Sequence, residues 1–234
     1  MIKTVLVTGG TSGFGKAAAK LLKKQGNQVI VVSRNQKKIN ETMDQLHVDG
    51  FSADISKKAE WDRLFAYVQE KYGRLDLLVN CAGAAITVAP LFDQTEQQID
   101  QSVQTNLMGV IWGCDTFGPM MAQQRSGTII NVASVCATHA WPGFSVYAAA
   151  KAGVRSFSKS LYVELREKGV RVTCLIPGGG DTNFGIAAGT GPDNDALLKA
   201  NDVGQAILDI WNLPEHVVVE ETTVWGIDQQ VEPL

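Results

Sequence analysis

The chain has 234 residues, of which 45% are hydrophobic and 19% charged, enough apolar material for the core of one large α/β domain. Its formal net charge of −3 argues against a nucleic-acid or acidic-membrane surface. The apolar run at the start is too short for a transmembrane helix and no signal-peptide pattern is present, so we expect a cytoplasmic protein.

Apolar runs alternate with amphipathic stretches along the whole chain. Strands are predicted at residues 2–7, 28–33, 50–53, 75–79, 128–133 and 170–176, with a last strand near 216–220. Helices are predicted near 14–25, 36–46, 57–72, 96–123, 146–168 and 201–212. Nearly all-apolar strands that alternate with helices indicate a parallel sheet with helices on both faces. We therefore expect α/β class, a doubly wound Rossmann fold, in a single domain over residues 1–234.

The first strand runs into a glycine-rich turn, and a helix follows. Glycines allow a tight turn and a close backbone approach to a diphosphate, and the helix N-terminus offers unpaired N–H groups. The spacing is G-x3-G-x-G rather than the general dinucleotide fingerprint, so a purely structural turn remains the alternative. The context favours a phosphate site made by Gly9, Thr11, Ser12, Gly13, Phe14 and Gly15.

The residues at the end of the second strand indicate which dinucleotide the protein binds. An NAD enzyme of this fold usually places an acidic residue there for the adenosine ribose. Here Ser33, Arg34 and Asn35 fill the position. A guanidinium can bind the additional phosphate of NADP in a two-pronged contact, and the two neutral side chains can add hydrogen bonds. The pattern predicts NADP(H), with a solvated Arg34 as the alternative.

Tyr147 and Lys151 are four residues apart on a predicted helix, so their side chains share one face. An ammonium beside a tyrosine favours the phenolate and lowers the phenol pKa, which suits proton transfer near neutral pH. Ser134 ends an apolar strand at the carboxyl edge of the sheet, where it could hydrogen-bond a substrate oxygen. The pair alone is weak evidence, because the same spacing arises by chance on helix surfaces.

Together these residues resemble the classical short-chain dehydrogenases/reductases over essentially the whole chain. The motifs that carry the resemblance are Thr8-Gly9-x3-Gly13-x-Gly15, Asn80-Cys81-Ala82-Gly83, Asn106, Ser134, Tyr147-x3-Lys151 and Pro177-Gly178-x3-Thr182. The chain departs from the family pattern at Cys81, usually asparagine, and at Gly180, usually aliphatic. Neither departure removes a catalytic group, but the second is expected to loosen the loop beside the nicotinamide.

The resemblance implies a role for each motif residue. Tyr147 is the general acid/base, Lys151 lowers its pKa and binds the nicotinamide ribose, and Ser134 orients the carbonyl. Asn106 anchors a water in a proton relay, with a tie to local backbone as the alternative. Asp54 contacts the adenine ring, with a helix N-cap as the alternative. The remaining implied cofactor contacts are Asn80, Ala82, Gly83, Pro177, Gly178 and Thr182.

The predicted function is an NADP(H)-dependent oxidoreductase that interconverts a secondary alcohol and a carbonyl on a small or medium substrate. Residues 178–200 are predicted to form a substrate lid, and Trp141, Phe144 and Phe184 to line an apolar pocket or pack in the core. One alternative is a 3-oxoacyl-thioester reductase that serves an acyl carrier protein. The other is an inactive cofactor-sensing regulator, against which the intact set of catalytic residues argues.

Partners are expected to be limited to the small-molecule substrate and further copies of the chain, without nucleic acid or membrane. Three scattered histidines and four cysteines without CxxC spacing give no metal-ligand pattern, and the cysteines are expected to be buried free thiols. Gly109, Gly113 and Gly118 permit close helix contact. In the family this helix and the Tyr147 helix commonly form subunit interfaces, so a homo-oligomer, dimer or tetramer, is expected. Close packing on the protein's own sheet is the alternative.

Overall fold

Seven parallel strands form one sheet in the order β3-β2-β1-β4-β5-β6-β7. The computed structural model describes residues 2–180 and 197–229. The strands are β1 (Thr4–Thr8), β2 (Gln28–Ser33), β3 (Asp49–Ser52), β4 (Leu77–Asn80), β5 (Gly127–Val132), β6 (Val170–Pro177) and β7 (Glu221–Val224). The strand order reverses between β1 and β4, which is the point where such sheets bind ligands at the strands' carboxyl ends.

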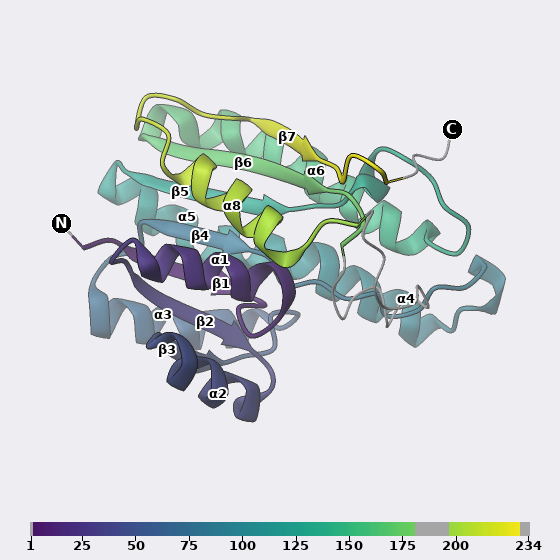
Figure 1. Ribbon diagram of the computed structural model, residues 1–234, viewed down its shortest axis with the longest axis horizontal. Helices are drawn as coiled ribbons and strands as arrows, with labels where there is room; N and C mark the ends of the chain where they lie inside the picture. The colour runs from purple at the N-terminus through teal and green to yellow at the C-terminus, as the bar shows by residue number, and fades with distance from the viewer. Residues whose placement is uncertain (1, 181–196, 230–234) are drawn as a thin grey trace.

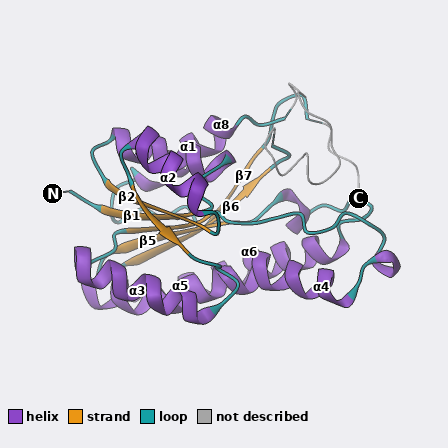
Figure 2. Ribbon diagram, turned by 90° about the horizontal axis from the view of Figure 1, so that it is seen from below, coloured by secondary structure: helices purple, strands orange, loops and turns teal. Residues whose placement is uncertain are grey.

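Helices cover both faces of this sheet, as the sequence predicts. They are α1 (Gly13–Lys24), α2 (Gln36–Leu46), α3 (Lys58–Tyr72), α4 (Glu96–Val103), α5 (Gly109–Gln124), α6 (Ser145–Leu165) and α8 (Ala200–Trp211). One face carries α1, α2 and α8, and the other carries α3, α5 and α6 (Figures 1 and 2). The predicted doubly wound α/β fold is therefore confirmed. None of the helices within residues 2–180 and 197–229 has the length and hydropathy that a membrane crossing needs.

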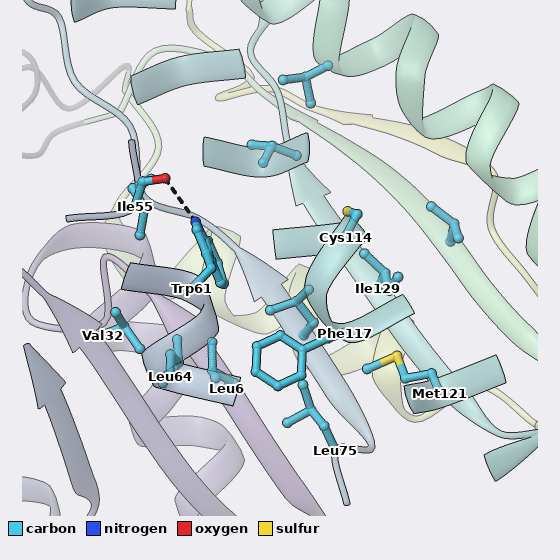
Figure 3. Packing of buried hydrophobic residues seen from close by; sticks show 14 of the residues in the cluster. Leu6, Val32, Ile55, Trp61, Leu64, Leu75, Cys114, Phe117, Met121 and Ile129 are labelled. Atoms are coloured by element: carbon cyan, nitrogen blue, oxygen red, sulfur yellow. Dashed lines mark hydrogen bonds between the residues drawn. The ribbon is translucent and has the colours of Figure 1, made fainter. Parts of the chain in front are cut away.

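The core beneath α3 and α5 shows why the long helix carries glycines. The Trp61 ring is buried and its Nε1 donates a hydrogen bond to the carbonyl of Ile55 at 2.9 Å (Figure 3). A methyl group at Gly113 would lie only 2.7 Å from that ring, and one at Gly109 would meet the Ile55 side chain at the same distance. These two glycines thus serve close packing inside the protein's own fold, which is the alternative the sequence left open.

The predicted helix over 96–123 is interrupted by a π-helical turn, Gln104–Met108. The turn separates α4 from α5, and Asn106 lies at its centre. The Asn106 Nδ2 donates to the carbonyl of Ser102 at 3.0 Å and to that of Ala84 at 2.9 Å. A side chain that binds the carbonyl four residues earlier competes with the helix's own N–H, which explains the irregular turn.

The last strand lies later than predicted: β7 is Glu221–Val224 instead of 216–220. The Arg171 guanidinium donates hydrogen bonds to the carbonyls of Trp211, Leu213 and Val217 at 3.0–3.2 Å. These bonds hold the connection after α8 as an irregular segment, so pairing with β6 begins only at Glu221. The strand propensity of the valines at 217–219 is overridden by hydrogen bonds to Arg171, which lies 46 residues before Val217.

Candidate active site

The turn after β1 is built so that only glycine fits at its centre. Gly9 has φ +68°, and a Cβ there would lie 2.9 Å from the Cα of Ala82. A Cβ at Gly15 would lie 2.5 Å from the Gly9 carbonyl oxygen. The Thr8 Oγ1 accepts hydrogen bonds from the backbone N–H groups of Cys81 and Ala82 at 3.1 and 3.0 Å. The two loops that follow β1 and β4 are therefore locked together at the N-terminus of α1.

A cavity of about 550 Å³ opens at this edge of the sheet. It brings together most of the residues that the sequence singles out, from motifs up to 170 positions apart. The predicted residues that line it are Gly9, Thr11, Ser12, Gly13, Phe14, Gly15, Ser33, Arg34, Asp54, Ala82, Gly83, Ser134, Tyr147, Lys151, Pro177 and Gly178. Trp141 and Phe144 also line it, as expected for an apolar pocket.

Ser134, Tyr147 and Lys151 all line the cavity. Tyr147 and Lys151 lie one turn apart on α6, with 8% and 3% of their surface exposed. The Lys151 Nζ donates to the Val132 carbonyl at 2.9 Å and lies 5.8 Å from the centre of the Tyr147 ring. Ser134 hydrogen-bonds Tyr147 and its Oγ accepts from the backbone N–H of Cys136 at 3.2 Å. The three side chains therefore have fixed directions.

Burial dominates the proton affinities of this group. It raises the pKa of Tyr147 above its ordinary value, and the hydrogen bond with Ser134 opposes the change. Burial also lowers the pKa of Lys151 from 10.5 to about 8, and nearby thiols oppose that change. The sequence predicts a lowered pKa for Tyr147, but in the structure burial raises it. The phenol stays protonated at neutral pH and can donate a proton.

Three predicted residues have side chains that do not line the cavity. Asn35 caps α2, its Oδ1 accepting from the backbone N–H of Lys38 at 3.0 Å. Asn80 is buried, and its Nδ2 donates to Asn131 Oδ1 at 2.9 Å. Asn106 is fully buried, and its Oδ1 accepts from the N–H of Ala84 at 3.0 Å. Asn35 is exposed, whereas Asn80 and Asn106 are buried, and each of the three amides makes a hydrogen bond to a local backbone or core group.

Two other predictions meet different outcomes. Asp54 lines the cavity, and its Oδ1 accepts hydrogen bonds from the N–H and the hydroxyl of Ser56 at 3.2 and 2.8 Å. This contact closes a local turn, and the N-cap of α3 is Lys57, so the helix N-cap alternative for Asp54 is wrong. Thr182, Phe184 and most of the predicted lid at 178–200 lie outside the described residues.

The cysteines and His139 near the site form no disulfide or metal cluster among the described residues. All four cysteines are free, with Cys114 and Cys174 buried and Cys81 and Cys136 partly exposed. His139 packs edge-on against Trp225, with 5.5 Å between ring centres. Among the described residues, no group of three His, Cys, Asp or Glu side chains is placed to hold a metal ion.

Gly180, which departs from the family pattern, packs against the large side chain of Phe14. A methyl group on Gly180 would overlap the Phe14 ring. The ring therefore fills the space that an aliphatic side chain at 180 would need, and it packs against the loop that the glycine was expected to loosen. The two positions form a size-matched pair.

We expect Gly180→Val to lower the thermal midpoint and weaken NADPH binding, because overpacking costs about 1–3 kcal/mol. Phe14→Leu opens the same space, so the double variant should recover most of the loss. Melting curves and NADPH fluorescence titrations of the four proteins measure the coupling. Losses that simply add in the double variant would show that the two residues are independent.

Sequence reasoning missed the contribution of the C-terminal segment. Gln229 and Leu197 line the cavity beside Gly178 and Gly179. Leu197 falls within the predicted lid at 178–200, whereas Gln229 belongs to no motif and is near none in sequence. Only the path of the chain after β7 brings Gln229 back over the end of β6, so no local signal could have identified it.

Comparisons with known proteins agree with this geometry. A family model described as short chain dehydrogenase matches residues 3–191. An uncharacterized oxidoreductase of Staphylococcus aureus (strain USA300) is 33% identical over 225 residues, which cover 95% of this chain and 96% of the relative. The closed form of a serine dehydrogenase complexed with NADP+ has a TM-score of 0.92 and 30% identity, covering 99% of this chain and 98% of the other. An alcohol dehydrogenase from the archaeon Thermococcus sibiricus, complexed with 5-hydroxy-NADP, has a TM-score of 0.88 and 25% identity, covering 100% of both chains. The chain belongs to the short-chain dehydrogenase/reductase family and is an oxidoreductase.

Proposed function

We propose that this protein uses NADP(H) to interconvert a secondary alcohol and a carbonyl on a small or medium substrate. The observation that carries the proposal is that Ser134, Tyr147 and Lys151 line the same cavity as the glycine turn at the end of β1. Two structural neighbours that were solved with NADP+ and with 5-hydroxy-NADP support the choice of cofactor.

The residues of the cavity fit a dinucleotide phosphate. The Cβ-free backbone at Gly9 and the N-terminus of α1 suit a diphosphate, which can approach the backbone closely and accept its N–H groups. Arg34 is exposed at the cavity wall, where it would hold the 2′-phosphate. Lys151 would hold the nicotinamide ribose. When bound, the nicotinamide supplies the hydride for carbonyl reduction and accepts it in alcohol oxidation.

The chain's own groups would then handle the substrate oxygen and its proton. Tyr147 donates a proton to the carbonyl oxygen, and Ser134 donates a hydrogen bond to the same atom. Trp141 and Phe144 exclude water from this end of the cavity. The Lys151 ammonium stabilises the phenolate that remains after the proton has left.

A panel of small carbonyl compounds with NADPH, read at the nicotinamide absorbance, tests the proposal. Serine and simple secondary alcohols with NADP+ form the second arm, and a 3-oxoacyl thioester forms the third. We expect turnover in the first two arms. Turnover of the thioester alone would favour the carrier-linked alternative, and no turnover in any arm would favour the cofactor-sensing regulator.

Carbonyl reduction should decline as the pH rises through about 8. Burial lowers the pKa of Lys151 to about 8, so its ammonium is present below that pH and lost above it. Without the cation, the phenolate left on Tyr147 is less stable and proton donation slows. The measurement is kcat against pH for the wild type and for Lys151→Met. The variant should be slow throughout and lack the step near pH 8, and a wild-type profile without that step would contradict the role of Lys151.

A further inference from the structure

The segment after β7 places the amide of Gln229 on the wall of the cavity. The Gln229 N–H donates to the Gly226 carbonyl at 3.0 Å, which closes a tight turn. A methyl group at Gly178 would lie 2.5 Å from the Gln229 Oε1, and one at Gly179 would lie 2.8 Å from its Nε2. The Trp225 ring lies against Gly178 on the same side. The amide therefore rests directly on the turn that ends β6.

The Oε1 atom of Gln229 is closed off from solvent and has no hydrogen-bond partner among the described residues. Asn80 Oδ1 and Thr116 Oγ1 share this condition, but neither residue lines the cavity. A buried acceptor without a donor is unfavourable. Gln229 lines the cavity, so a rotation of its amide would bring this oxygen to the cavity surface, where a donor on the ligand could pair with it.

This acceptor lies close to the predicted catalytic group. Gly178 directly follows β6, Ser134 lies two residues after β5, and these strands are neighbours in the sheet. Adjacent strands are about 5 Å apart, so the backbones at Ser134 and Gly178 lie close to one another where the two strands end. Ser134 and Gln229 line the same cavity. A molecule in this cavity can therefore contact both residues.

We propose that Gln229 is a specificity-determining residue whose Oε1 accepts a hydrogen bond from a hydroxyl or amino group on the substrate. The inference rests on the proposed function, because Ser134 and Tyr147 must hold the reacting oxygen while Gln229 holds the second polar group. The substrate class is a small secondary alcohol, or its ketone, with a hydrogen-bond donor on the carbon next to the reacting one. An apolar group at that position is disfavoured because it leaves the buried oxygen unpaired.

Three alcohols of nearly the same shape test this assignment: butane-2,3-diol, 3-aminobutan-2-ol and 3-methylbutan-2-ol, each oxidised with NADP+. For the wild type we expect kcat/KM for the diol and the amino alcohol to exceed that of the methyl compound by roughly tenfold or more. Gln229→Leu keeps the approximate size and removes the acceptor, so the ratio should fall to near one. Gln229→Glu retains acceptor oxygens and should keep the preference. Asp228→Asn, an exposed change on the same segment, is the matched control and should leave the ratio unchanged.

Fluorescence titration with NADPH separates a substrate contact from a cofactor contact, and we expect the same dissociation constant in all four proteins. A leucine variant that retains the wild-type preference overturns the assignment. Weaker NADPH binding in that variant, with equal losses for all three alcohols, also overturns it and would make the nicotinamide carboxamide the partner of Gln229. A wild type that oxidises all three alcohols equally contradicts the inference but not the proposed function. Failure to oxidise any of them, with turnover of other compounds in the carbonyl and alcohol panel, contradicts the inference alone. Failure with these alcohols and with the whole panel contradicts both.

Discussion

Replacing Tyr147 with phenylalanine is expected to lower turnover by about 10²–10⁴-fold, the usual contribution of a positioned acid or base. The substitution removes one oxygen from a side chain that is only 8% exposed, so the ring can keep its place on α6. Burial raises the pKa of this phenol, which makes it a proton donor at neutral pH, and no hydroxyl remains in the variant to replace it. The measurement is kcat for carbonyl reduction under conditions in which chemistry limits the rate.

The control for this variant is its affinity for NADPH. Because the ring and Lys151 remain, the dissociation constant should change by less than about threefold, which is under 1 kcal/mol. Tyr162→Phe, on the same helix, is the matched substitution away from the cavity and should leave turnover unchanged. If Tyr147→Phe keeps more than about a tenth of the wild-type turnover, the tyrosine is not the acid/base.

Replacing Arg34 with alanine is expected to erase most of the preference for NADPH over NADH. The side chain stands exposed at the end of β2 and lines the cavity, next to Ser33, where an acidic residue would repel the additional phosphate. A hydrogen bond to a charged group contributes about 1.5–3 kcal/mol, or roughly 10- to 150-fold in kcat/KM. The wild type should therefore prefer NADPH by at least about that factor.

The companion variant Ser33→Asp should reverse the preference, because it adds repulsion toward the phosphate and a partner for the ribose hydroxyls. Steady-state kinetics with both cofactors on the three proteins give the ratios. Lys37→Ala, an exposed change on the neighbouring helix, controls for the loss of a positive charge. Equal kcat/KM for NADPH and NADH in the wild type would refute the assignment of Arg34.

Sequence patterns predict the architecture of this protein, and they also predict that Ser134, Tyr147 and Lys151 lie in one site. Continuous apolar runs such as that of β1 form buried parallel strands because both of their faces are covered. The glycine turn and the Tyr147/Lys151 pair act through short spacings, which a helix or a tight turn converts directly into proximity. Patterns of this kind depend on local backbone geometry, so they can be interpreted without knowing which other elements pack against them.

The surroundings of several polar side chains depend on packing between elements that are distant in sequence. Asn80 and Asn106 belong to recognisable motifs, yet neither lines the cavity, and their amides are hydrogen-bonded to Asn131 and Ala84. The burial that changes the pKa of Tyr147 and Lys151 is likewise set by the whole surroundings of α6. Neither the hydrogen bonds of these amides nor the pKa shifts can be predicted from the spacing of residues in a motif.

Contacts between distant parts of the chain could not be predicted from local sequence patterns either. The Phe14 ring meets Gly180 across about 170 residues, Arg171 delays the start of β7, and Gln229 reaches the cavity from the end of the chain. Periodicity reports which face of an element is apolar, whereas these contacts depend on how elements remote in sequence pack against each other. The fold and the grouping of the motif residues follow from sequence patterns, whereas the cavity walls, the pKa shifts of Tyr147 and Lys151 and the place of Gln229 follow from tertiary packing.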